Sequence, residues 1–402
     1  MPRTMLSSRY RRARYLMVAL VGLVSGTAAA QEHYRPIAYA APASGGGDVF
    51  DRHLLGHSQP NCTPRGTIPY QPYAPQPYAP EPYSPEPGAE PAPMTPDQVF
   101  MPQPQGALLA SADIAAGLSN VGYIDPAVPQ SQFRLRFDAG YDFGSPDKAE
   151  FFYAKCGCFR VAGIDPNAPG PAPADGRPET NIDSFQDIRS YVEVATSERF
   201  SVFGEFPVRF LNPEVNDNTA GFADMNVGFK YALIACPTQF LTLQFRAYLP
   251  TGDAGDGLGT DHVSLEPGLL YFSRPTERLI IESEFKGWVP IDGTDFAGEI
   301  LQYGIGAGYI AIANPSFTVT PTLEFVGWTI LDGAETDVTA PGAVGDVSGE
   351  TIVNIKPGVR IGWGRPDQQY INDQSLYIGY GTPITDNAWY DDIVRVEYRM
   401  LF

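Results

Sequence analysis

The strict alternation of apolar and polar residues from residue 131 onward constrains the fold of this chain more than any other feature. It is clearest between Gln132 and Phe143, where two faces separate cleanly. One face carries Phe133, Leu135, Phe137, Ala139, Tyr141 and Phe143, and the other carries Gln132, Arg134, Arg136, Asp138, Gly140 and Asp142. A period of two is typical of a β-strand with one apolar face. Because strands average about 5 or 6 residues in soluble proteins, this strand is unusually long.

The pattern recurs along the chain and predicts twelve strands. They lie near residues 132–143, 186–196, 199–210, 224–233, 241–249, 262–271, 279–286, 301–309, 317–325, 353–361, 374–382 and 391–402. Long connections, such as 144–185 and 329–349, alternate with tight turns, such as 197–198 and 236–238. This alternation is typical of an up-and-down barrel with its loops at one end and its turns at the other. We therefore predict an all-β fold, a closed antiparallel up-and-down transmembrane β-barrel over residues 131–402.

A soluble β-sandwich has the same period, so three further features decide between the two folds. Strands of ten or more residues match the roughly 9–11 residues that cross a bilayer. The polar faces mix acids and bases, which suits a wet interior. Aromatic residues fall near strand ends, as interface girdles require: Phe206, Phe210, Tyr231, Phe240, Tyr271, Tyr309 and Phe317. We therefore expect the apolar faces to meet lipid.

Both ends of the chain indicate export to a bacterial outer membrane. Residues 1–30 are typical of a cleaved signal peptide, with five arginines, an apolar stretch from Leu16 and small residues ending at Ala30. The last strand carries a C-terminal assembly signal on its apolar face, formed by Val394, Val396, Tyr398, Met400 and Phe402. The expected partners are outer-membrane lipid and the barrel-assembly machinery. A net charge of −19 excludes a general nucleic-acid binder, which needs a basic face.

Residues 31–130 differ from the rest of the chain because they are rich in proline and tyrosine. Their centre, Pro69 to Pro85, has a proline every two or three residues, which prevents helices and sheet ladders. We predict a disordered periplasmic linker, with one short helix near residues 107–119. A second interpretation is a ligand for peptidoglycan or a periplasmic partner.

The polar faces of the predicted strands supply a set of charged residues expected to line the lumen. They are Arg134, Arg136, Glu193, Glu205, Arg209, Lys230, Arg246, Glu266, Glu282, Glu284, Lys286, Glu324, Lys356, Arg360, Arg395 and Arg399. They either select solutes at a constriction or brace the interior with ion pairs. Gly304, Gly306 and Gly308 share this face. They leave room for a solute or an inward-folded segment, or they permit the strand to bend.

Four cysteines in an exported chain permit disulfides. The predicted topology places Cys156 with Cys158 and Cys62 with Cys236. Acidic residues in two loops, Asp253 to Asp261 and Asp292 with Asp295, do not match a calcium-loop spacing. We predict no metal site and no cofactor.

One hairpin resembles a known family. It contains Leu249-Pro250-Thr251-Gly252-Asp253, then Gly257 to His262 and Leu265 to Gly268. These residues resemble a bacterial family of outer-membrane transporters labelled for the MetA pathway of phenol degradation. The resemblance covers residues 131–402 and implies a channel for small solutes of an aromatic or hydrophobic kind.

The expected function is an outer-membrane channel for passive uptake or efflux of small solutes, and not an enzyme. The alternative is a structural anchor that tethers the envelope through the proline-rich tail. A minor alternative is an outer-membrane lipid hydrolase, because His262 and Ser264 share one predicted inner face.

Overall fold

The computed structural model describes residues 119–173, 177–314, 317–337, 339, 342–363 and 374–402. The chain divides into two units, residues 1–54 and 55–402, and all described residues belong to the second. The predicted signal peptide, the linker up to residue 118 and most of the predicted helix at 107–119 lie outside the described residues. Cys62 also lies outside them, so its pairing with Cys236 stays a prediction.

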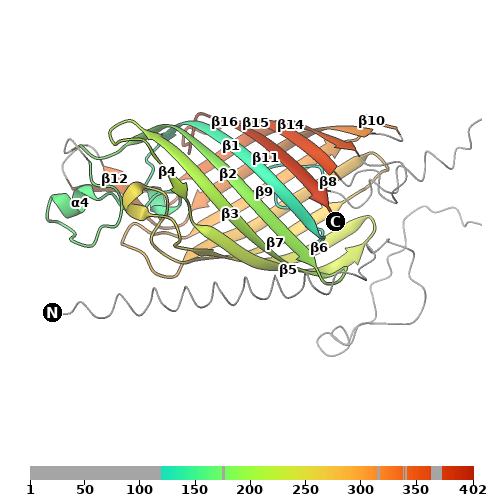
Figure 1. Ribbon diagram of the computed structural model, residues 1–402, viewed down its shortest axis with the longest axis horizontal. Coiled ribbons are helices and arrows are strands. Elements are labelled where there is room, and N and C mark those ends of the chain that lie inside the picture. The colour runs from blue at the N-terminus through green and yellow to red at the C-terminus, as the bar shows by residue number, and fades with distance from the viewer. Residues whose placement is uncertain (1–118, 174–176, 315–316, 338, 340–341, 364–373) are drawn as a thin grey trace, which may run out of the picture. The chain divides into compact units, whose positions relative to one another are not determined.

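Twelve long antiparallel strands form a closed barrel, which confirms the predicted fold class (Figure 1). They are β1 (Gln132–Gly144), β2 (Asn181–Ala195), β3 (Phe200–Pro213), β5 (Met225–Cys236), β6 (Gln239–Leu249), β7 (Ser264–Ser273), β8 (Leu279–Pro290), β9 (Ile300–Tyr309), β11 (Phe317–Ile330), β14 (Thr351–Trp363), β15 (Gln374–Pro383) and β16 (Asp392–Leu401). Each pairs with its neighbours in sequence, and β1 pairs with β16 to close the ring. Closure leaves no unpaired sheet edge, as hydrocarbon demands.

Short helices and strands lie in the connections at the two ends of the barrel. The long connections hold η4 (Lys148–Glu150), α4 (Cys158–Val161), β4 (Thr219–Phe222), η5 (Ala254–Asp256) and the hairpin of β12 (Ala334–Asp337) and β13 (Ala343–Asp346). Helix α4 and β12 lie at one end, here called the loop end, and β10 (Ile312–Ala313) lies at the other, the turn end (Figure 1). The long and short connections therefore alternate as predicted. None of the helices within the described ranges is long and apolar enough to cross a membrane.

Apolar side chains cover the outside of the barrel. Leu243, Ile305 and Phe325 are 44%, 55% and 38% exposed in the middle of their strands, whereas the charged side chains of the same strands point inward. Burying such a surface in lipid is favourable, and leaving it in water is not. The exterior is therefore suited to face lipid rather than water.

Two aromatic residues that were expected on the apolar faces point inward instead. Asp142 has a positive φ of 52°, and beyond it Phe143 is buried at the loop end. Phe240 has the same parity as the inward-facing Thr242, and it packs with Ala127 and Val128 inside the turn end. Both residues contribute to closing the barrel rather than to a lipid interface.

A charge on the outer surface should destabilise the barrel. We expect Ile305→Arg to lower the free energy of unfolding by about 2–4 kcal/mol, because the guanidinium must enter hydrocarbon. Ile164, which is 57% exposed in the loop after α4, is the matched control, and Ile164→Arg should change it by less than about 0.5 kcal/mol. Urea unfolding in lipid vesicles measures both. Equal effects would mean that Ile305 does not face lipid.

Candidate functional site in the barrel interior

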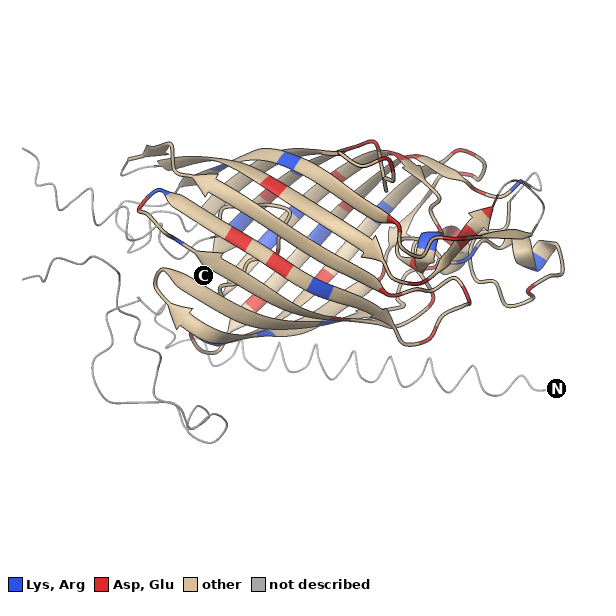
Figure 2. Cartoon of the chain, turned by 180° about the vertical axis from the view of Figure 1, so that it is seen from behind, with Lys and Arg blue, Asp and Glu red and all other residues tan. Residues whose placement is uncertain are grey.

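The charged residues predicted to line the lumen all lie on the inner face of the barrel wall. Figure 2 shows acids and bases on the strands across the barrel. Fifteen of the sixteen are buried and Arg136 is half-buried. The wall charges pair with one another: Lys230 Nζ lies 3.0 Å from Glu193, and Arg209 Nε lies 2.9 Å from Asp187. Bracing by ion pairs is therefore present in this interior.

Three further wall acids were missed by the sequence analysis. Asp138 binds Arg395, Asp187 binds Arg209, and Glu397 accepts from both Arg360 and Arg399. Each lies on the same strand face as a predicted lumen residue. The alternation could have identified them, as it did the rest.

The lumen is occupied by residues 119–130, here called the luminal segment. This corrects the predicted linker boundary at residue 130, because these twelve residues are fixed inside the barrel. Their main-chain N–H groups donate to wall carboxylates. Glu324 accepts from Gly122 at 2.9 Å, Tyr123 at 2.9 Å and Ile124 at 3.0 Å. Three successive N–H groups around one carboxylate form an anion-binding nest.

Two neighbouring carboxylates on β8 continue this pattern. Glu282 accepts from the N–H groups of Asn120 at 2.9 Å and Val121 at 3.4 Å. Glu284 accepts from the N–H group of Asp125 at 3.0 Å. Six successive N–H groups therefore donate to three wall carboxylates.

The carbonyl groups of the segment bind arginines from β14 and β16. Arg360 donates to the carbonyl oxygens of residues 120 and 121 at 3.0 and 2.8 Å. Arg395 donates to the carbonyl oxygen of Gly122 at 2.7 Å, and Arg399 donates to that of Ser119 at 2.9 Å. Such charge-assisted hydrogen bonds are about twice as strong as neutral ones. The wall therefore recognises the main chain from both its donor and its acceptor side.

Two side chains of the segment also bind the wall. The Asp125 carboxylate lies 2.9 Å from Arg246 and 3.2 Å from Lys286. The Tyr123 ring has the Lys356 ammonium 4.1 Å and the Arg395 guanidinium 4.2 Å from its centroid. Asp125 could not have been identified as a site residue, because it lies in the region predicted to be linker.

The row of glycines on β9 makes room for the luminal segment. A Cβ on Gly306 would lie 2.8 Å from Val121, and one on Gly308 would lie 3.2 Å from the Cβ of Asn120. A Cβ on Gly304 would lie 3.1 Å from Ile124. Of the alternatives for this row, room for an inward-folded segment is the one that the structure bears out.

The luminal segment enters the barrel from the turn end and returns to it. Ser119 binds Arg399, which is two residues from the end of β16 at Leu401. Tyr123 reaches Arg395, nearer the start of that strand, and the chain then returns to begin β1. The segment is therefore a re-entrant loop whose deepest part lies near Tyr123.

The loop end is closed by a second element, residues 145–157, here called the lid. Its aromatic rings pack in the mouth of the barrel. Phe151 lies 5.0 Å from Trp288 and 5.2 Å from Trp389 between ring centroids, and Phe152 stacks on Phe143 at 4.3 Å. These residues belong to one buried cluster. The lid therefore separates the luminal segment from the loop end.

Charged contacts fasten the lid. The Arg209 guanidinium lies 3.8 Å from the centroid of the Phe152 ring and donates to its carbonyl oxygen at 3.1 Å. Lys148 Nζ lies 2.7 Å from Glu350 and 3.4 Å from Glu335. The lid is thus bound both to the barrel wall and to the connection between β11 and β14.

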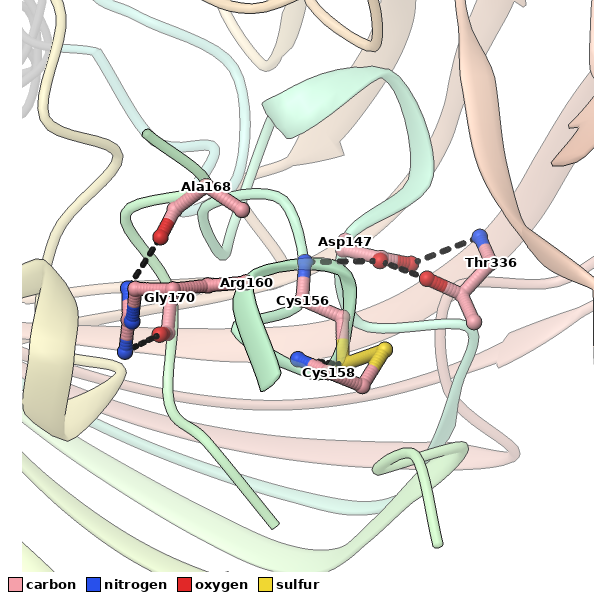
Figure 3. Close-up of a disulfide and its surroundings, with 7 residues drawn as sticks. All are labelled: Asp147, Cys156, Cys158, Arg160, Ala168, Gly170 and Thr336. Carbon is pink, nitrogen blue, oxygen red and sulfur yellow. Dashed lines mark hydrogen bonds between the residues drawn. A yellow bond between two sulfur atoms is a disulfide. The ribbon is translucent and has the colours of Figure 1, made fainter. Parts of the chain in front are cut away.

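The far end of the lid contains the predicted disulfide between Cys156 and Cys158, which is present (Figure 3). Asp147 accepts hydrogen bonds from the hydroxyl and the N–H of Thr336 and from the N–H of Cys156. Burial raises the pKa of the Asp147 carboxyl to about 6, although the hydrogen bonds from Thr336 act in the opposite direction. Arg160 binds the carbonyl groups of residues 168 and 170. The contacts of Asp147 with Thr336 hold the lid to the β12–β13 hairpin, and those of Arg160 hold α4 to the chain that follows it.

The residues of the hydrolase alternative do approach one another. Ser264 Oγ lies 3.0 Å from His262 Nδ1, and His262 Nε2 lies 3.8 Å from a Glu150 carboxylate oxygen. All three are buried where the lid meets the start of β7, with 0%, 2% and 0% of their surfaces exposed. A lipid ester cannot reach a hydroxyl enclosed in this way. The group joins the start of β7 to the lid, because Glu150 belongs to the lid and lies beside His262. Glu150 also binds Thr294 in the connection after β8.

The acidic loop after β6 is organised by its own hydrogen bonds. Asp224 accepts from Gly252 and Thr260, and Asp253 accepts from Gly255. Within the described ranges, no group of three or more His, Cys, Asp or Glu side chains is placed to share a metal ion.

No protein-family model and no curated protein matches the chain. Solved structures similar to it include the COG4313 outer membrane channel from Pseudomonas putida F1, at 13% identity and a TM-score of 0.41, covering 69% of this chain and 100% of that one. They also include the NanC porin, at 9% identity and a TM-score of 0.36, covering 67% of this chain and 100% of that one. The KdgM porin is similar at 11% identity and a TM-score of 0.32, covering 67% of this chain and 99% of that one. At these identities the similarity is one of fold. The MetA label is not confirmed by them.

Proposed function

We propose that this protein is an outer-membrane channel for small solutes, and that the conformation described here is its closed state. The observation that carries the proposal is the luminal segment itself. A barrel wall lined with charges encloses a loop that is bound by hydrogen bonds and ion pairs, without being part of the wall. Such a loop can leave the lumen while the barrel stays closed on itself.

Several features support a location in the outer membrane. The exterior is apolar, the backbone groups of the barrel are paired within it, and the sequence begins with the features of a signal peptide. Of the residues proposed as an assembly signal, Val394, Val396, Tyr398 and Met400 lie on the outer face of β16, and Phe402 directly follows the strand and is exposed. The aromatic or hydrophobic solutes that the family resemblance implies stay a prediction.

Deletion of residues 119–130 tests the channel proposal. We expect the full-length protein to show rare openings in planar bilayers and the deletion variant to show sustained current steps. The hydrogen bonds of Glu282 and Glu324 are made largely with the segment, whereas Arg395 and Arg399 keep Asp138 and Glu397 as partners. The deletion also removes Asp125, the partner of Arg246 and Lys286, so it frees both carboxylates and cations, and the reversal potential in a salt gradient measures which of them sets the ion selectivity. A folded deletion variant without current steps would contradict the proposal.

A structural anchor is the second candidate, and the same segment favours it. Its ten main-chain hydrogen bonds to Glu282, Glu284, Glu324, Arg360, Arg395 and Arg399 would hold a tail that precedes residue 119. In that case the working part would be the tail, with peptidoglycan or a periplasmic protein as its partner. Cell-wall binding that is lost with the tail, in a barrel that never conducts, would favour the anchor.

A further inference from the structure

We propose that the lumen of this barrel contains a binding site for short peptides, which recognises the peptide main chain. The proposal deepens the proposed function, on which it rests, because it makes short peptides the class of solute that the channel admits. The luminal segment then occupies the site as a tethered ligand of the same chemical kind.

The first argument is that the wall groups bind atoms that every peptide has. Glu282, Glu284 and Glu324 accept from the main-chain N–H groups of residues 120–125. Arg360, Arg395 and Arg399 donate to the carbonyl oxygens of residues 119–122. A sugar or a simple aromatic compound cannot present this sequence of alternating donors and acceptors. A peptide of seven or more residues can present it.

The second argument is that the six wall groups lie on four strands and enclose a space that suits a main chain. The carboxylates come from β8 and β11, and the guanidiniums come from β14 and β16. Between them in the ring lies the glycine row of β9, Gly304, Gly306 and Gly308, whose missing side chains admit a backbone. Bracing alone does not require glycines at three successive inward positions.

The third argument concerns specificity. A Cβ on Gly122 would lie 2.1 Å from the Tyr377 ring, so the nest around Glu324 requires a glycine at that position. Tyr377 is held there by its hydroxyl, which donates to Glu324 at 2.9 Å. The side chain after the glycine, that of Tyr123, meets the cation pair of Lys356 and Arg395. The preferred ligand is therefore a glycine-containing peptide with an aromatic residue after the glycine.

The site must be vacated before a peptide can bind from solution, because the tethered segment competes at an effective concentration in the millimolar range. Two variants vacate it in different ways. One lacks residues 119–130. The other is Gly122→Leu in the full chain, where the clash with Tyr377 expels the segment. Gly287→Leu is the matched control, because a Cβ on Gly287 meets nothing within 4 Å.

The experiment uses a fluorescent peptide of sequence 119–130 and measures its binding to detergent-solubilised protein by anisotropy. We expect at least tenfold tighter binding to each vacated variant than to wild type or Gly287→Leu. N-methylation at the positions of residues 122, 123 and 124 should weaken binding at least thirtyfold, because it removes three donors to Glu324. Alanine at positions 121 and 124, in a peptide that keeps the tyrosine at 123, should weaken it by less than tenfold.

Each outcome separates the peptide site from the channel. Equal binding of the methylated and unmethylated peptides would overturn main-chain recognition. Current steps in the deletion variant with no peptide binding would overturn the peptide site and leave the channel standing. Peptide binding by a deletion variant that shows no current would support the binding site but contradict the claim that peptides pass through the channel. Block of the current by the unmethylated peptide alone would support both.

Discussion

Glu324→Ala should release the luminal segment and raise the open probability of the channel about a hundredfold. Glu324 accepts three main-chain hydrogen bonds from residues 122–124, and hydrogen bonds to a charged group contribute about 1.5–3 kcal/mol each. Water that enters the vacated lumen replaces part of this loss, so we expect a net change of about 3 kcal/mol, or two decades in the equilibrium. Glu324→Gln keeps one acceptor oxygen and should have an intermediate effect.

Two readouts test this expectation independently. Planar-bilayer recording gives the open probability, and chymotrypsin cleavage after Tyr123 reports whether the segment has left the barrel. The matched control is Glu205→Ala, which removes a buried wall carboxylate that binds Arg136, Arg189 and Asn226. That variant should weaken the barrel without releasing the segment. If both alanine variants raise the current equally, the segment is not the gate.

The part of this interior that could be predicted from the sequence is the part built from alternating side chains. A strand has a period of two, so the charged residues on its polar face can be assigned to one side of the wall once the strand itself is recognised. Asp142, whose φ is positive, is an exception because it is exposed. The same reasoning predicted the barrel, the alternation of long loops and short turns between its two ends, and its apolar exterior. The error at Phe240 arose at a strand end, where an aromatic residue was expected to face lipid although its position in the alternation places it on the inner face.

The luminal segment could not be predicted in this way because the wall binds its main chain. Main-chain contacts leave no periodic signal, and residues 119–130 share the proline content of the region before them. The available signals lay in the wall instead. The inward row of Gly304, Gly306 and Gly308 marks the space for the segment. The lid had a more direct signal, since Phe151, Phe152 and Tyr153 are three successive aromatic residues within a long loop.

The lid and the luminal segment are joined through one set of residues, which has a consequence for how the channel opens. The ring of Tyr123 packs against the same buried cluster as the lid, and Lys356 lies near both Tyr123 and Tyr390. Release of the segment removes the Tyr123 ring from one side of that cluster. Opening at the turn end should therefore loosen the lid at the loop end, so that a single displacement opens both barriers.

A disulfide between residues 120 and 308 should reverse the opening caused by Glu324→Ala. A Cβ on Gly308 would lie 3.2 Å from the Cβ of Asn120, and disulfides need about 3.5–4.5 Å, so a shift of a few tenths of an ångström suffices. In the triple variant Asn120→Cys, Gly308→Cys and Glu324→Ala, the oxidised protein should conduct at least tenfold less than the reduced protein. The bond tethers the segment at the turn end, where it enters the lumen. Glu324→Ala alone, with and without reductant, controls for the native cysteines. Equal currents in the oxidised and reduced triple variant would show that ions bypass a segment fixed in place, and the gate would then have to be the lid.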